Sequence, residues 1–395
     1  MKNKPGNTLF RTLIVCMLIL IALSACIGKA APNKLDSTDA EAYYNSGFDY
    51  FQKGEIERAI TDYDQAIQLD PKMADAYNNR GFAYFQKGEI ERAITDYDQA
   101  IQLDPNNANA YSNRGFAYNR KGELDRAMSD LDQAIQLDPK MAEAYINRGI
   151  TYLQKGELDR AKSDLDRAIQ LDPKMAEAYN NRGITYLQKG EIDRAISDFD
   201  QAIQLDPKWA DAYINRGVAY YQKGEFERAI TDYDQAIQLN PNQAKAYNGR
   251  GITYFQKGEL DHAISDLDQA IQLNPNLAEA YNVRGIAYYQ KGELERAISD
   301  LDQAILLNPN GPAYVARGNA YNQKGEFERA ITDYDQAIHL NPNQAEIYLV
   351  RGGTYFQLGD KEKAIADLRK VLELSDNPEL RQVADEALRD LGVEE

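Results

Sequence analysis

Six asparagines recur at intervals of 34 residues, and their carboxamides could bind a peptide backbone. They are Asn45, Asn79, Asn113, Asn147, Asn181 and Asn215. A carboxamide both donates and accepts hydrogen bonds, so it can pair with a peptide unit whatever side chain that unit carries. The row ends at Gly249, Val283, Ala316 and Val350, although the residues around it continue to repeat. We therefore predict a peptide-binding row; the alternative is that these amides satisfy neighbouring helices.

Other candidates for catalytic or metal-binding chemistry are few. His262 and His339 fall at different places in the repeat, where other copies have Arg, Gln or Leu. Acidic pairs such as Asp198 and Asp200 lie two residues apart on a predicted helix, so they point to different faces. The recurring Lys-Gly-Glu lacks the glycines and Ser/Thr of a phosphate loop. We predict no enzymatic activity, no metal site and no cofactor.

The N-terminus carries a cysteine in a setting typical of lipid attachment. Basic residues precede an apolar run, 13–25, which is short for a membrane span and fits the core of a signal peptide. Its end, Leu-Ser-Ala-Cys, resembles a bacterial lipobox, whose cysteine receives a diacylglycerol. The resemblance implies a lipoprotein signal peptide over 1–25 and a lipidated Cys26 that begins a tether over 26–39. An ordinary signal peptide or an uncleaved anchor is the alternative.

This resemblance also predicts the location of the protein. A lipidated Cys26 places the chain in a bacterial cell envelope, on the outer side of the cytoplasmic membrane or in the outer membrane. Ile27 follows the cysteine, whereas an aspartate there would resemble an inner-membrane retention signal. The one other cysteine, Cys16, falls inside the predicted signal peptide, so we expect no disulfide in the folded part.

The elements that would position these residues repeat every 34 residues. In the copy over 176–209, apolar residues follow a helical spacing up to Gly190, which can take the left-handed conformation that ends a helix. A second helical run ends at Asp206, because the residue before a proline is pushed out of the α region. Ten predicted helix pairs begin at Ala40, Ala74, Ala108, Ala142, Ala176, Ala210, Ala244, Ala278, Gly311 and Ala345.

A final helix follows the ten repeats, which cover residues 40–378. Residues 379–395 are predicted to form a capping helix and tail, since the end of a repeat array needs an element with a polar outer side. One face of this helix carries Leu380, Val383, Ala384, Ala387 and Leu391.

The repeat has a specific residue pattern. With the first residue of each copy as position 1, all ten copies have an aromatic residue at 4, Gly at 8, Tyr at 11 and Ala at 20, and all but the last have Ala at 27 and Pro at 32. This pattern resembles the tetratricopeptide repeat (TPR) over residues 40–378. The resemblance implies an all-α, right-handed superhelical solenoid of helix–turn–helix repeats that binds proteins and catalyses no reaction.

The resemblance also implies where partners bind. In this family, positions 2, 5, 6, 9, 12 and 13 of the first helices line a concave groove, so the six asparagines would stand at position 6 beside apolar residues. The row is similar to the asparagine ladder of O-linked N-acetylglucosamine transferases, which holds extended peptides. The implied peptide-binding set adds Phe48, Phe82, Phe116, Phe51, Phe85 and Tyr221.

A charged pair recurs in the predicted helix interface. Position 7 is Arg in nine copies, from Arg80 to Arg351, and position 23 is Asp in all ten. A guanidinium between two helices needs a carboxylate partner. We predict an Arg–Asp bridge inside each repeat, for example between Arg182 and Asp198.

The charge of the chain narrows the choice of partners. A formal net charge of −17 repels phosphate backbones, which argues against nucleic acid, and it favours membrane attachment through lipid alone. The sequence therefore predicts a membrane-anchored, non-catalytic scaffold that binds extended peptide segments or partner helices. Two alternatives remain open: an assembly or pilotin-type factor for a pilus, secretion or outer-membrane machinery, and an adaptor that docks envelope hydrolases.

Overall fold

The computed structural model describes residues 37–393, and over this range the chain forms helices and no strand. The prediction of an all-α fold built from helix pairs is therefore confirmed. The predicted signal peptide, Cys26 and the tether up to residue 36 lie outside the described residues. Between residues 37 and 393, no helix is long and apolar enough to cross a bilayer.

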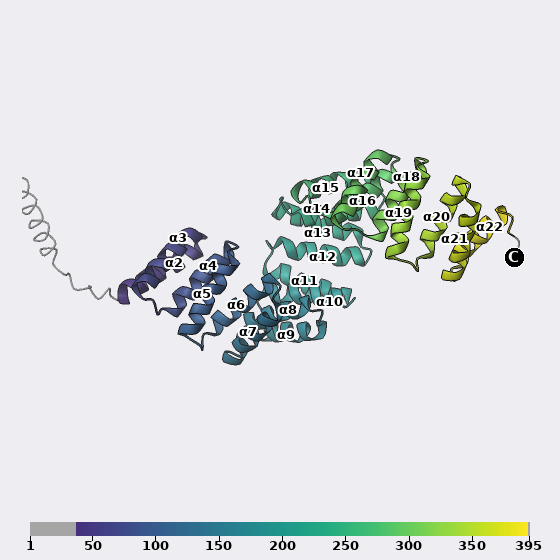
Figure 1. Ribbon diagram of the computed structural model, residues 1–395. Helices are drawn as coiled ribbons and strands as arrows, with labels where there is room; N and C mark the ends of the chain where they lie inside the picture. Colours follow the sequence, from purple (N-terminus) through teal and green to yellow (C-terminus); the bar gives the residue numbers. More distant parts are fainter. Residues whose placement is uncertain (1–36, 394–395) are drawn as a thin grey trace, which may run out of the picture. The chain divides into compact units, whose positions relative to one another are not determined.

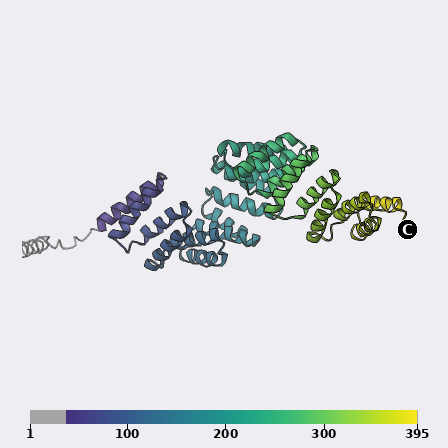
Figure 2. The ribbon, with the colours of Figure 1, turned by 45° about the horizontal axis from the view of Figure 1, so that its top comes forward.

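The described residues divide into two compact units, 37–173 and 174–393, whose helices are labelled in Figure 1. The first unit contains α2 (Ser37–Gln52), α3 (Ile56–Leu69), α4 (Ala74–Gln86), α5 (Ile90–Leu103), α6 (Ala108–Lys121), α7 (Leu124–Leu137), α8 (Ala142–Gln154) and α9 (Leu158–Leu171). The second contains α10 (Ala176–Gln188), α11 (Ile192–Leu205), α12 (Ala210–Gln222), α13 (Phe226–Leu239), α14 (Ala244–Gln256), α15 (Leu260–Leu273), α16 (Ala278–Gln290), α17 (Leu294–Leu307), α18 (Gly311–Gln323), α19 (Phe327–Leu340), α20 (Ala345–Leu358), α21 (Lys361–Leu374) and α22 (Pro378–Asp390). Each even-numbered helix from α2 to α20 packs on the odd-numbered helix that follows it, as a second view shows (Figure 2).

Glycine and proline end the helices at the positions that the sequence predicts. Gly190 has a φ of 76°, and the N–H of Glu191 donates to the carbonyl oxygen of Tyr186 at 2.8 Å, which closes the end of α10. Asp206, before the proline, has a φ of −131° and ends α11. The predicted helix ends in this repeat are confirmed.

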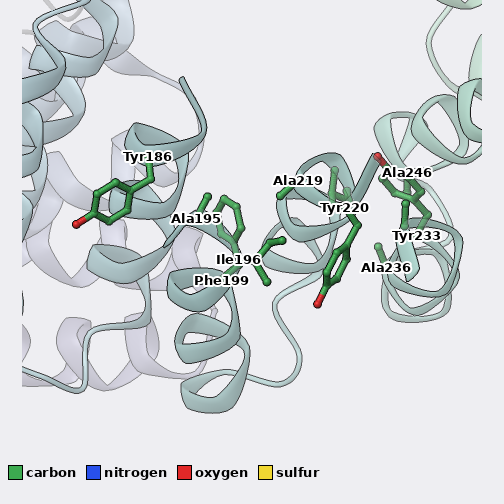
Figure 3. Close-up of a cluster of buried hydrophobic side chains, with 11 residues drawn as sticks. Tyr186, Ala195, Ile196, Phe199, Ala219, Tyr220, Tyr233, Ala236 and Ala246 are labelled. Atoms are coloured by element: carbon green, nitrogen blue, oxygen red, sulfur yellow. The ribbon is translucent and has the colours of Figure 1, made fainter. Parts of the chain in front are cut away.

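Small residues let the two helices of a repeat approach closely. A Cβ atom on Gly183 of α10 would lie 2.6 Å from Cε1 of Phe199, whose side chain on α11 is fully buried. Ala195 and Ala202 of α11 are fully buried as well. The apolar cluster extends from α10 to α14, and in Figure 3 Ala195, Ile196 and Phe199 of α11 lie between Tyr186 of α10 and Tyr220 of α12. Stacking of repeats therefore builds the core of the second unit.

Helix α22 covers the end of the second unit. Ala384 and Leu388 are buried in the terminal cluster, and Arg381 donates to two backbone carbonyl groups at the end of α21. Val383, which the sequence places on the apolar face of this helix, is 50% exposed. The buried stripe follows the four-residue spacing of Ala384 and Leu388, and Val383 lies beside it.

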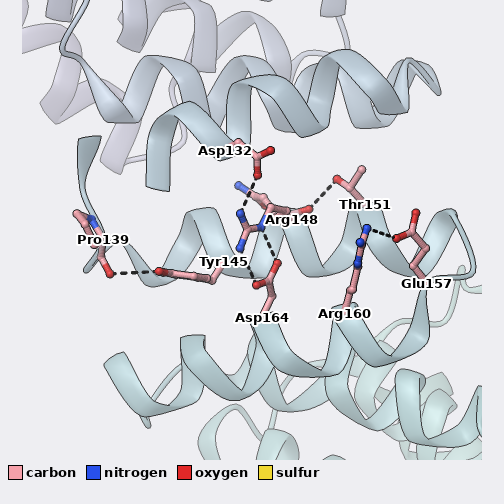
Figure 4. A network of polar contacts seen from close by, with 9 residues as sticks. Asp132, Pro139, Tyr145, Arg148, Thr151, Glu157, Arg160 and Asp164 are labelled. Atoms are coloured by element: carbon pink, nitrogen blue, oxygen red, sulfur yellow. Dashed lines mark hydrogen bonds and ion pairs between the residues drawn. The ribbon is translucent and has the colours of Figure 1, made fainter. Parts of the chain in front are cut away.

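Arg148 of α8 shows how charged residues join the repeats of the first unit (Figure 4). Its Nε and Nη2 atoms donate to the two carboxylate oxygens of Asp164, on α9 of the same repeat, at 2.7 and 2.8 Å. Its Nη1 atom donates to Asp132, on α7 of the preceding repeat, at 2.7 Å. Asp164 is only 7% exposed, so the guanidinium supplies the partner that its buried charge requires.

The bidentate pair recurs along the chain, and the predicted Arg–Asp bridge is confirmed in nine repeats. In the first repeat, which has serine at position 7, Ser46 donates to Asp62 at 2.5 Å. The nine pairs are Arg80–Asp96, Arg114–Asp130, Arg148–Asp164, Arg182–Asp198, Arg216–Asp232, Arg250–Asp266, Arg284–Asp300, Arg317–Asp333 and Arg351–Asp367.

A bond from the position-7 arginine to the preceding repeat is a feature that sequence reasoning missed. Its acceptor is the aspartate at position 25, as in Arg80–Asp64, Arg114–Asp98, Arg148–Asp132, Arg216–Asp200, Arg250–Asp234, Arg284–Asp268, Arg317–Asp302 and Arg351–Asp335. The sequence contains a signal for it. The first copy lacks the arginine, with Ser46 at position 7, and the last copy lacks the aspartate, with Arg369 at position 25.

Candidate functional site

A hollow of about 570 Å³ opens among α12, α14 and α16, the first helices of three consecutive repeats in the second unit. Two members of the predicted peptide-binding set, Asn215 and Tyr221, line it. The full lining is Ile214, Asn215, Val218, Tyr221, Gln222, Tyr233, Lys245, Asn248, Gly249, Ile252, Leu277 and Glu279. Apolar and amide side chains therefore dominate, with one lysine and one glutamate.

Gly249 stands where the asparagine row ends, and it leaves room for a buried tyrosine. A Cβ atom at this position would lie 2.6 Å from Cζ of Tyr233, on α13. Tyr233 is 2% exposed, and this burial raises the pKa of its hydroxyl. The phenol therefore stays protonated at neutral pH and can donate a hydrogen bond into the hollow.

Two further hollows lie along the same face, on α16, α18 and α20. Their volumes are about 350 and 420 Å³, and Tyr289 and Asn319 line both of them. The smaller also contacts Val315 and is mostly apolar, whereas the larger contacts Asn322 and other amides. The groove face of the second unit thus offers both apolar and amide surface from α12 to α20.

Most asparagines of the predicted row form hydrogen bonds to the preceding repeat. The Nδ2 atoms of four asparagines donate to the position-5 side chain of the preceding repeat. These bonds are Asn79 to Tyr44 (3.0 Å), Asn113 to Asn78 (3.0 Å), Asn147 to Ser112 (3.2 Å) and Asn215 to Asn180 (2.9 Å). Asn181 donates instead to the backbone carbonyl of Glu177 at 2.9 Å, and Asn45 is exposed. These contacts favour the alternative that the amides satisfy neighbouring helices, and peptide binding by the row stays a prediction.

The predicted phenylalanines lie in the first unit, where they pair across repeats. The rings of Phe51 and Phe82 have centroids 5.3 Å apart, and those of Phe85 and Phe116 are 5.2 Å apart. Phe48 is 45% exposed. These aromatic pairs contribute to stacking of the repeats, and their predicted role in peptide binding stays a prediction.

Three amides that sequence reasoning missed have buried oxygens. Among the described residues, the Oδ1 atoms of Asn248, Asn282 and Asn322 are buried without a hydrogen-bond partner. Asn248 and Asn282 stand at position 5, and the following repeats have Val283 and Ala316 at position 6 in place of a donor. The sequence signal for these two unpaired oxygens is an asparagine at position 5 that is followed by a repeat without asparagine at position 6.

Acidic residues recur at position 2 of the repeats in the second unit. They are Glu177, Asp211, Glu279 and Glu346, and Lys245 is the one basic residue at this position. Glu279 accepts a hydrogen bond from Nδ2 of Asn248 at 3.0 Å, and Asp211 accepts one from Gln243. Of these acidic residues, Glu279 lines the 570 Å³ hollow, together with Lys245.

Several solved structures of other proteins are similar to this chain. The chain is similar to the crystal structure of the APC/C hetero-tetramer Cut9–Hcn1, with 18% identity and a TM-score of 0.56 over 95% of this chain and 82% of that chain. It is also similar to Pseudomonas aeruginosa PilF (22% identity, TM-score 0.49, covering 52% and 94% of the two chains) and to YrrB, a TPR protein with an unusual peptide-binding site (29%, 0.36, 47% and 95%). The first of these likenesses shows a shared fold.

Family models match most of the chain. The TPR repeat model matches residues 47–88, 83–122, 117–156, 151–190, 185–224, 217–258, 253–292 and 318–359. Two tetratricopeptide repeat models match residues 278–310 and 345–378, and no curated protein matches the chain. Because these matches cover most of residues 47–378 and the helix pairs follow the same repeat, the chain belongs to the tetratricopeptide repeat family.

Proposed function

We propose that this protein is a non-catalytic scaffold that holds an extended peptide segment in the groove of its second unit. TPR repeats indicate a protein–protein interaction scaffold, and proteins with these repeats bind protein or peptide partners. The observation that carries the proposal is the 570 Å³ hollow among α12, α14 and α16. An apolar concavity with a few convergent polar groups is the usual character of a ligand site.

The polar groups of the hollow suit a peptide. Amides of Asn215 and Asn248 can pair with peptide N–H and C=O groups, and Ile252 and Val218 offer apolar contact for side chains. The surface runs across successive repeats, which suits a segment laid across the helices. An extended chain rises about 3.3 Å per residue, and packed helices lie about 8–10 Å apart. About three residues therefore cross one helix, and about nine residues cross the three helices of the hollow.

The test compares two isoleucines at the same repeat position. Ile252 lines the hollow, whereas Ile150 occupies position 9 in the first unit. A panel of fluorescein-labelled, unstructured nonapeptides is titrated against the full-length chain in detergent. For peptides that bind, Ile252→Ala should weaken binding about tenfold, because several buried methyl and methylene groups lose their contact. Ile150→Ala should leave the affinity unchanged; equal losses, or no binder in the panel, would contradict the proposal.

We also propose that Cys26 anchors the protein to a bacterial membrane by lipid. The support is the sequence of residues 23–26 after the apolar run of residues 13–25. The negative net charge of −17 disfavours direct attachment to an anionic bilayer. This anchor would place the groove in the cell envelope, on the outer side of the cytoplasmic membrane or in the outer membrane.

The substitution Cys26→Ser should abolish lipidation, because a hydroxyl does not substitute for the thiol in this modification. If the variant is still cleaved, it should leave the membrane fraction, because it carries no acyl chains to hold it there. Otherwise it should remain as an uncleaved precursor. Fractionation combined with intact-mass measurement checks both outcomes. A processed Cys26→Ser variant that still fractionated with membranes would show that the anchor lies elsewhere.

A crosslinking pull-down from native membranes separates peptide capture from the two alternatives. An assembly factor or a hydrolase adaptor binds a folded partner, so it should be recovered with one partner in fixed stoichiometry. A protein whose groove holds extended segments should be recovered with several different partners, each of which contains an unstructured region.

A further inference from the structure

Hydrogen bonds between neighbouring repeats occupy part of the asparagine row. The position-6 amide of one repeat donates to the position-5 side chain of the repeat before it, as Asn215 does to Asn180 and Asn113 does to Asn78. The position-5 oxygen is thereby occupied within the protein. Where the next repeat has no asparagine at position 6, this oxygen loses its internal donor.

Asn248 lines the 570 Å³ hollow and is a position-5 asparagine that receives no hydrogen bond from the next repeat. The following repeat has Val283 at the donor position, and Oδ1 of Asn248 is buried without a partner. Its Nδ2 atom donates to Glu279 at 3.0 Å. This contact determines the orientation of the amide, since a turned amide would place Oδ1 against a carboxylate. A buried, unpaired carbonyl oxygen costs free energy that a ligand N–H can recover.

Glu279 links the amide to the charge of the ligand. A lysine or arginine side chain of a ligand that paired with Glu279 would release Nδ2 of Asn248 from the carboxylate. The freed amide can then turn about its terminal bond, so that Nδ2 donates to a peptide carbonyl and Oδ1 accepts a peptide N–H. Lys245 and Glu279 are the two charged side chains that line the hollow, and the net charge of −17 favours a positively charged partner for the protein as a whole.

We propose that Asn248 and Glu279 together bind an extended, basic and apolar peptide segment, with the amide on its backbone and the carboxylate on a lysine or arginine. This inference rests on the groove function proposed above. It assigns the polar contacts of the bound peptide to the repeat where the asparagine row ends. The row itself then serves mainly to join repeats, and the interruption at Val283 leaves the amide available.

Restoring the row is the sharpest test. Val283→Asn supplies the missing donor to Asn248, whereas Val350→Asn makes the same change at position 6 of a repeat whose predecessor has Val315 at position 5. The probe is a fluorescein-labelled nonapeptide with three leucines and three lysines, titrated by anisotropy against the full-length chain in detergent. Val283→Asn should weaken binding about two- to tenfold, the effect of one net hydrogen bond, and Val350→Asn should not change it.

Two further variants support the assignment. Asn248→Val removes the acceptor and should match the loss in Val283→Asn, and position 5 tolerates valine in the repeat that contains Val315. Glu279→Gln should weaken the lysine peptide but not an analogue in which glutamine replaces lysine. Thermal melts should show that all variants fold, with Val283→Asn at least as stable as the unmodified chain.

The outcomes separate this inference from the groove function. If the lysine peptide binds and neither Val283→Asn nor Asn248→Val changes its affinity, the inference is overturned while the groove function stands. If a matched peptide with glutamate in place of lysine binds more tightly, the assigned ligand charge is wrong. Failure of every peptide to bind the unmodified chain would contradict both proposals.

Discussion

Replacing Arg148 with leucine is expected to lower the free energy of unfolding by about 3–5 kcal/mol. The substitution leaves Asp164, which is 7% exposed, without the guanidinium that binds both of its carboxylate oxygens. It also removes the bond to Asp132 of the preceding repeat. Urea unfolding followed by circular dichroism measures the change.

Arg160 gives a control within the same repeat. Its Nη1 atom binds Glu157 at 2.7 Å, but its side chain is 68% exposed, so Arg160→Leu should cost about 1 kcal/mol or less. Replacing both Arg148 and Asp164 with leucine should recover much of the loss, because a buried ion pair can often be exchanged for apolar residues. Equal losses for Arg148→Leu and Arg160→Leu would mean that the bridges do not hold the repeats together.

Gly183→Leu is expected to lower the free energy of unfolding by about 1–3 kcal/mol or more. Even a Cβ atom would lie 2.6 Å from the ring of the fully buried Phe199. In an array, each repeat contacts mainly its neighbours, so hydrogen exchange should speed up most in α10, α11 and the repeat that follows. A uniform loss of protection from α2 to α22 would contradict this local coupling.

Gly353 is the matched control for this substitution. It lies in the interior of α20, and a Cβ atom there would meet no other atom within 4 Å. Gly353→Leu should therefore leave stability unchanged or raise it by up to about 1 kcal/mol, since glycine is a poor helix former. A large loss at Gly353 would show that helix backbone effects, not close packing, explain the result at Gly183.

Much of the fold followed from local chemistry. The glycine that ends α10 and the proline after Asp206 act within a few residues, so a single copy of the repeat was enough to predict both helix ends. The Arg182–Asp198 pair was predictable because a charge in a helix interface requires a partner, and Asp recurs at position 23 in all ten copies. The position of Val383 depends on the rotation of α22 against α21, which helical periodicity alone does not determine.

Less of the candidate site was predictable. Asn215 and Tyr221 were placed in the groove from the family pattern, and both line the hollow. The partner of each asparagine depends on the register between repeats, which the sequence of one repeat does not contain. For the same reason the unpaired oxygen of Asn248 was missed, since it arises from the residue at position 6 of the next repeat.

The most direct test of the central claim is site-specific photo-crosslinking from the groove. A photoreactive amino acid replaces Ile252, in the 570 Å³ hollow, or Ile150, at the same repeat position in the first unit. The labelled lysine and leucine nonapeptide is added and crosslinked adducts are quantified by mass spectrometry. The groove proposal predicts saturable crosslinking from position 252, suppressed by excess unlabelled peptide, and little from position 150. Crosslinking that is equal at the two positions, or that unlabelled peptide does not suppress, would contradict it.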